Sequence, residues 1–81
     1  MNAQTEALAT HVLDAKGLNC PLPILRTRKA IADMPSGEML RVLATDPGSV
    51  NDLRSFCNQT GHALVSSRED AGVFEFLIRK S

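Results

Sequence analysis

The residue best placed to do chemistry in this sequence is Cys20, which is followed by Pro21 and, two positions later, by Pro23. An ionised cysteine is both a nucleophile and a metal ligand, so its surroundings decide how it is used. Proline is favoured in the first turn of a helix, because the N–H that it lacks would have no partner there. The two prolines therefore predict a helix that begins at Pro21, with Cys20 at its N-cap.

The thiol of Cys20 is expected to ionise easily at the start of that helix. A residue before proline is kept out of the helical conformation, so the sulfur should face the positive end of the helix dipole. That placement lowers a thiol pKa from its ordinary value of about 8.5. Arg26, Arg28 and Lys29 lie on the same helix and add positive potential. We therefore predict a large thiolate fraction at neutral pH.

Three kinds of cysteine chemistry fit this sequence poorly. A dithiol oxidoreductase usually carries its second cysteine where Pro23 stands. A cysteine hydrolase needs a base beside its nucleophile, and only His11 and His62 are available, with no evident third group. Zinc needs several ligands, and the two histidines with Cys20 and Cys57 lack metal-ligand spacing. We expect neither a metal nor a cofactor.

The remaining chemistry is sulfur exchange. A thiolate can attack the persulfide of a donor, take its outer sulfur, and lose that sulfur to another cysteine by the same displacement. A second thiol within reach would attack the loaded persulfide and release its cargo as sulfide. Cys57 should therefore be distant or buried. Its place on an apolar stripe with Val50 and Leu53 favours burial in the core.

The whole chain limits the kinds of protein to which this cysteine can belong. Its 81 residues can bury one core, so we expect a flexible N-terminal arm over residues 1–10 and a single domain over residues 11–81. Nine basic and nine acidic residues cancel, which argues against nucleic-acid binding through bulk charge. No apolar run is long enough to cross a bilayer, and the first ten residues lack a secretory signal. A cytoplasmic monomer is the expectation.

Hydrophobic periodicity and turn residues predict six elements in a βαβαββ order. The strands are expected over residues 11–14, 39–45, 62–68 and 73–80, and the helices over residues 21–34 and from residue 49 to a capping glycine at Gly61. Leu40, Val42 and Ala44 form the one continuously apolar face of the second strand. The last two strands are separated by residues typical of a hairpin turn.

This order predicts an α+β fold. Two right-handed crossovers that step in the same direction place both helices on one face of the sheet. We therefore expect a two-layer α/β sandwich with a mixed four-stranded sheet. Periodicity alone does not predict the order of the strands in that sheet.

The residues around Cys20 resemble the signature of a known family. The run from Gly17 to Pro23, which reads Gly-Leu-Asn-Cys-Pro-Leu-Pro, is similar to the Cys-Pro-x-Pro motif of the TusA/SirA sulfur-carrier family. The similarity extends over nearly all of the chain from residue 11 onward. It continues through Arg28-Lys29, Gly37-Glu38, Asp46-Pro47, Asp52, Phe56-Cys57, His62 and the closing Leu77-Ile78-Arg79-Lys80. The Arg28-Lys29 pair and the closing run resemble the TusA branch in particular.

The resemblance implies a fold like the C-terminal domain of a bacterial translation initiation factor. It also implies a persulfide carrier rather than a self-sufficient enzyme. Cys20 would accept sulfur from a cysteine desulfurase or another sulfurtransferase and pass it to a downstream sulfur-relay protein. The best-known destination is 2-thiouridine in tRNA, without direct contact with nucleic acid. Related members serve sulfur oxidation, molybdenum cofactor assembly or selenium metabolism, and the sequence does not choose among these branches.

Several other residues carry expectations of their own. Arg26, Arg28 and Lys29 form either a solvated face or a docking surface for an acidic partner. Asp46 is a turn residue before Pro47, and its place in the family pattern suggests contact with a partner. Asp52 is explained as an acidic residue in the first turn of a helix.

A second hypothesis makes Cys20 the redox sensor of a regulatory or interaction module. It predicts partner binding that follows the oxidation of Cys20, with no uptake of sulfur.

Overall fold

The computed structural model describes residues 9–81. Its elements are β1 (Ala9–Ala15), α2 (Leu22–Ala32), β2 (Met39–Ala44), α3 (Gly48–Thr60), β3 (Ala63–Asp70) and β4 (Val73–Arg79). The predicted βαβαββ order is confirmed. The expected flexible arm falls mostly on residues 1–8, which lie outside the described residues. Residues 9 and 10, which we had placed in that arm, belong to β1 instead, because Ala9 already pairs with Met39 of β2.

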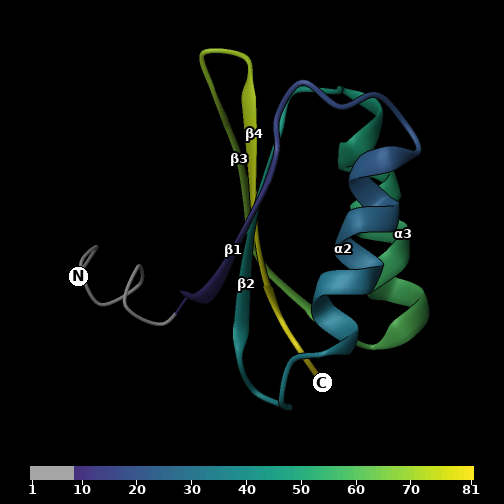
Figure 1. Cartoon of the computed structure of the whole chain (residues 1–81), viewed down its shortest axis with the longest axis vertical. Coiled ribbons are helices and arrows are strands. Elements are labelled where there is room, and N and C mark those ends of the chain that lie inside the picture. The colour runs from purple at the N-terminus through teal and green to yellow at the C-terminus, as the bar shows by residue number, and fades with distance from the viewer. Residues whose placement is uncertain (1–8) are drawn as a thin grey trace.

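The four strands form one mixed sheet in the order β1-β2-β4-β3. β1 and β2 are parallel, whereas β4 is antiparallel to both β2 and β3. Among the described residues, both helices, α2 and α3, lie side by side on the same face of this sheet, and no described helix covers the other face (Figure 1). The structure therefore confirms the predicted two-layer α/β sandwich and adds the strand order.

The core lies between the sheet and the two helices. The predicted apolar face of β2 is fully buried at Leu40, Val42 and Ala44. Alternate residues of a strand point to the same face, so Phe76 and Ile78 of β4 enter the same layer. The helices contribute buried side chains at helical spacing, namely Thr27, Ile31, Leu53, Phe56 and Cys57. Both helices thus pack against one continuous apolar face of the sheet.

The opposite face of the sheet is held by charged side chains. Glu75 on β4 accepts hydrogen bonds from Arg41 on β2 and from Arg68 on β3. Burial alone would raise the pKa of Glu75, but the hydrogen bonds from Arg68 and Arg41 outweigh it and lower this pKa. Within residues 9–81, neither helix is long and apolar enough to span a membrane.

Candidate functional site

Cys20 lies in the loop between β1 and α2, where its side chain is exposed. The helix begins at Leu22 with Pro21 as its N-cap, so our prediction of Cys20 at the N-cap is wrong by one residue. Pro23 occupies the first turn, as expected, and is buried. The Cys20–Pro21 peptide bond is cis.

The loop that carries Cys20 is anchored to the loop between β2 and α3. Because β1 and β2 are parallel, the segments that follow them emerge at the same edge of the sheet. There the N–H of Gly17 donates to the Thr45 hydroxyl over 2.9 Å, and the N–H of Cys20 donates to the Asp46 carboxylate over 2.9 Å. Gly17 has a φ of 81°, a left-handed conformation that favours glycine. Sequence and topology together therefore hold the backbone on both sides of the thiol.

Asp46 is itself held in place by the start of α3. Its carbonyl accepts hydrogen bonds from the N–H and the hydroxyl of Ser49, which is fully buried. The carboxylate is thereby directed toward the backbone of Cys20. The structure thus gives Asp46 a role inside the chain, while its contact with a partner stays a prediction.

The thiol of Cys20 donates a hydrogen bond to the carboxylate of Asp52, with Sγ and Oδ2 separated by 3.3 Å. This hydrogen bond is the main cause that raises the pKa of Cys20 above its ordinary value, followed by desolvation and by the negative charges of Asp52 and Asp46. Our prediction of a lowered pKa is therefore wrong. It considered only α2, whereas both carboxylates come from the β2–α3 segment.

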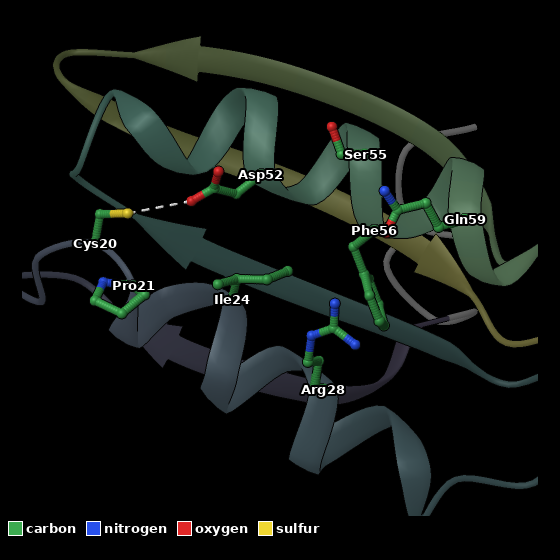
Figure 2. Close-up of a pocket in the computed structure, with 8 residues that line it drawn as sticks. All are labelled: Cys20, Pro21, Ile24, Arg28, Asp52, Ser55, Phe56 and Gln59. Carbon is green, nitrogen blue, oxygen red and sulfur yellow. Dashed lines mark hydrogen bonds between the residues drawn. The ribbon is translucent and has the colours of Figure 1, made fainter.

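Beside the thiol, an open groove of about 360 Å³ runs between α2 and α3. Its walls are formed by Cys20, Pro21, Ile24, Arg28, Asp52, Ser55, Phe56 and Gln59 (Figure 2). Ile24 and Phe56 make it partly apolar. The guanidinium of Arg28 lies 5.0 Å from the centre of the Phe56 ring, a cation–π geometry that leaves the charge at the groove surface. The groove thus offers apolar contacts, one cation and one carboxylate next to the exposed sulfur of Cys20.

Of the three basic residues that we predicted to bind a partner, one, Arg28, lines the groove. Arg26 and Lys29 are also exposed on α2, but they are not among the lining residues. Their binding of an acidic partner stays a prediction.

Cys57 is buried on α3, in the core, as predicted. Desolvation raises the pKa of its thiol, which keeps it neutral and unreactive. Neither cysteine forms a disulfide. Cys20 is therefore the exposed thiol of the chain.

The histidines contribute little to this site. His11 pairs with Glu38 over 2.7 Å, and Nδ1 of His62 accepts a hydrogen bond from the N–H of Ser81 over 3.1 Å. No histidine lines the groove beside Cys20. Over the part of the chain that the structure describes, no three His, Cys, Asp or Glu side chains are grouped so as to hold a metal ion.

Asp52, Ser55 and Gln59 belong to the groove but were missed as site residues in the sequence. Their spacing of three and four positions places them on one face of a helix, which is a signal that the sequence contains. The sequence does not indicate, however, that this face of the helix lies opposite Cys20. That information comes from the packing of α3 against α2.

The fold and site define a small α+β protein that presents one exposed thiol at the start of a helix, beside a groove between its two helices. A family model described as sulfurtransferase TusA matches residues 11–80. The chain therefore belongs to the TusA family, as the Cys-Pro-x-Pro resemblance indicated.

Named relatives support this membership. The chain is 59% identical to the sulfur carrier protein TusA of Allochromatium vinosum, over 85% of this chain and 91% of that protein. It is 48% identical to a putative sulfur carrier protein of Neisseria meningitidis serogroup A, over 98% and 97% of the two chains. The crystal structure of a SirA-like protein from Desulfitobacterium hafniense superposes with a TM-score of 0.78 at 29% identity, covering 86% of this chain and 96% of that one.

Proposed function

We propose that this protein is a sulfur carrier that takes up a sulfur atom as a persulfide on Cys20 and hands it to another protein. The observation that supports the proposal most strongly is the contrast between the two cysteines, one exposed and one buried. A carrier needs a sulfur that two successive partners can reach. It also needs no second thiol nearby that would release the cargo. The names of the relatives from Allochromatium vinosum and Neisseria meningitidis support the same role.

The transfer is an exchange between a thiol and a persulfide. Sγ of Cys20 attacks the outer sulfur of the donor's persulfide, so that one S–S bond forms as the donor's S–S bond breaks. The donor leaves as a thiolate and takes up a proton, which balances the proton lost by Cys20. The products are a donor thiol and a persulfide on Cys20. Because one S–S bond replaces another, the step needs no oxidant or reductant.

The partners that suit this chemistry are a cysteine desulfurase as donor and a downstream sulfur-relay protein as acceptor. The groove beside Cys20 is open and partly apolar, which suits a surface loop of a partner better than a small substrate. Arg26, Arg28 and Lys29 add positive charge to α2 and favour an acidic partner surface. We place the carrier in the cytoplasm, with 2-thiouridine formation in tRNA as the destination of the sulfur.

Incubation of the protein with a cysteine desulfurase and cysteine tests the proposal. The intact mass should rise by about 32 Da, and a thiol reductant should reverse the gain. Cys20→Ser should abolish the gain, whereas Cys57→Ala should retain it. The carrier function is wrong if no mass is gained, or if the gain survives in Cys20→Ser.

The raised pKa of Cys20 also bears on the redox-sensor hypothesis. Cysteines that sense oxidants react as thiolates and have low pKa values. A hydrogen-bonded neutral thiol reacts slowly with peroxides. Sulfur exchange also proceeds through the thiolate, so the names of the relatives from Allochromatium vinosum and Neisseria meningitidis are what favour the carrier over the sensor.

A further inference from the structure

The sulfur of Cys20 faces the negative charge of α3 as well as the start of α2. Asp52 reaches the thiol directly, while Asp46 reaches the N–H of the same residue. Figure 2 shows the Asp52 carboxylate pointing across the mouth of the groove at Sγ. Two carboxylates from one short segment thus surround a single cysteine.

Within the part of the chain that the structure describes, neither carboxylate forms an ion pair with a cationic side chain. Among residues 9–81, the ion pairs involve other acidic residues, namely Asp14, Glu38 and Glu75. Arg28 is the cation that lines the groove, and its guanidinium lies over Phe56. No ion pair among these residues therefore competes with Cys20 for the half-buried carboxylate of Asp52.

We propose that Asp52 is the residue that sets the reactivity of Cys20: it holds the unloaded carrier as a hydrogen-bonded neutral thiol and so restrains its reaction with small electrophiles. This inference rests on the proposed function, because only a carrier needs a cysteine that ignores small molecules and reacts with proteins. It assigns Asp52 a positioning and specificity role.

A docked donor overcomes this restraint by proximity. Holding two reacting groups together raises their effective concentration by several orders of magnitude, so a small thiolate fraction suffices within a complex. A free electrophile has no such advantage, and its rate follows the thiolate fraction directly. The hydrogen bond to Asp52 thus slows unwanted reactions and leaves protein-to-protein transfer fast enough.

The test compares wild type with Asp52→Asn in the rate at which iodoacetamide alkylates Cys20, followed by intact mass from pH 6 to pH 11. Asparagine keeps an oxygen that accepts the hydrogen bond but removes the charge. For each pKa unit that the thiol loses, the thiolate fraction at neutral pH rises about tenfold. The nucleophilicity of each thiolate falls about threefold, given a Brønsted coefficient of about 0.4–0.5. We expect Asp52→Asn to react faster than wild type at neutral pH and slower than wild type at the alkaline plateau, so that the two profiles cross.

Two rate profiles that cross distinguish this role from a structural one. A change in the exposure of Cys20 would multiply the rate at every pH by the same factor, and the curves would not cross. Asp33→Asn, which removes one charge at the opposite end of α2, should reproduce the wild-type profile. The proposal is overturned if the profile of Asp52→Asn is unchanged, is scaled uniformly, or moves to higher pH.

This alkylation experiment does not depend on sulfur uptake. If the profiles cross but wild type gains no mass from the desulfurase, the role of Asp52 stands and the carrier function fails. If wild type gains the mass but the profiles do not cross, the carrier function stands and the role of Asp52 is overturned.

Discussion

At the scale of single residues, the reactivity of Cys20 depends on which charge lies nearer. The start of a helix presents about half a positive charge, spread over its first turn. Cys20 precedes that turn, and proline at positions 21 and 23 removes two of the N–H groups that would carry it. Asp52 presents a full negative charge with an oxygen 3.3 Å from Sγ. Since Coulomb energy scales with charge over distance, the carboxylate outweighs the dipole.

The different burial of the two cysteines predicts how many of them a thiol reagent can modify. Cys20 is exposed, whereas Cys57 is 6% exposed and has a raised pKa. At neutral pH, iodoacetamide should add one carbamidomethyl group to the folded protein and two to the protein in strong denaturant, as measured by intact mass. In Cys20→Ser the folded protein should gain none. Rapid double labelling without denaturant would contradict the buried position of Cys57.

Hydrogen exchange of the Cys20 amide can test whether Asp46 anchors the loop that carries Cys20. Asp46→Ala removes the acceptor for the N–H of Cys20, a charge-assisted hydrogen bond of 2.9 Å. Such a bond contributes roughly 1.5 kcal/mol, so hydrogen exchange of the Cys20 amide should become about tenfold faster by NMR. Asp46→Asn keeps an acceptor oxygen and should stay near the wild-type rate. Equal rates in wild type and Asp46→Ala would mean that Asp46 does not hold the loop.

At the scale of elements, the sequence predicted the order of all the helices and strands that residues 9–81 form, because hydrophobic period and turn residues are local signals. Leu40, Val42 and Ala44 alternate along a strand, and their burial follows from that pattern alone. Gly61 ends α3 with a φ of 84°, again as local chemistry requires. Features that depend on a single helix or strand, such as its buried face and its last residue, could thus be predicted from the sequence.

The candidate site was predicted only in part, because its partners meet across elements. Cys20, Pro21 and Pro23 are close together in the sequence, and their spacing alone predicted a thiol at the start of a helix. Asp52 lies 32 positions from Cys20, and an acidic residue near the start of a helix has a sufficient local explanation. Only the packing of α3 beside α2 brings its carboxylate to the sulfur. The predicted direction of the Cys20 pKa shift was therefore wrong, and the role of Cys20 as the sulfur-bearing residue stays a prediction.

The charged face of the sheet predicts a pH-dependent stability. The pKa of Glu75 is lower in the folded chain than in the unfolded chain, so over that interval the unfolded chain binds more protons. The stabilisation is present above the unfolded pKa of about 4.3 and is lost as the pH falls through the folded pKa. At pH 7, Glu75→Gln should lower the free energy of unfolding by about 1 kcal/mol.

Urea unfolding at pH 7, 5 and 3 measures this effect of Glu75. The gap between wild type and Glu75→Gln should be largest at pH 7 and should close toward pH 3. Glu69→Gln, at an exposed position of β3, serves as the matched control and should show little difference at any pH. A gap that persists undiminished at pH 3 would mean that the charge of Glu75 is not its cause.

At the scale of the whole molecule, the sheet works as a platform for the site. The parallel pairing of β1 with β2 brings the Cys20 loop and the Asp46 loop to one edge. The two crossovers place α2 and α3 side by side on one face of the sheet (Figure 1). Residues of both helices line the groove beside the thiol. The geometry of the site therefore depends on the core that joins these layers.

That dependence leads to a prediction about Phe76, the largest fully buried side chain, which lies at the centre of the sheet on β4. A chain of 81 residues has a total stability of about 4–12 kcal/mol. Truncation of a buried phenylalanine to alanine costs roughly 3–5 kcal/mol. Phe76→Ala should therefore remove much or all of the stability, seen as a lower urea midpoint or lost helical circular dichroism. Phe74→Ala, on the same face but only half-buried, should lower the free energy of unfolding by about half as much.

Phe76→Ala should also change the labelling of the cysteines. Cys57 is protected from reagents only while the helices pack against the sheet, so partial unfolding of Phe76→Ala should expose it to iodoacetamide at neutral pH. If Phe76→Ala has the same urea midpoint as wild type and still gains only one carbamidomethyl group, the packing of Phe76 is not what holds the site together.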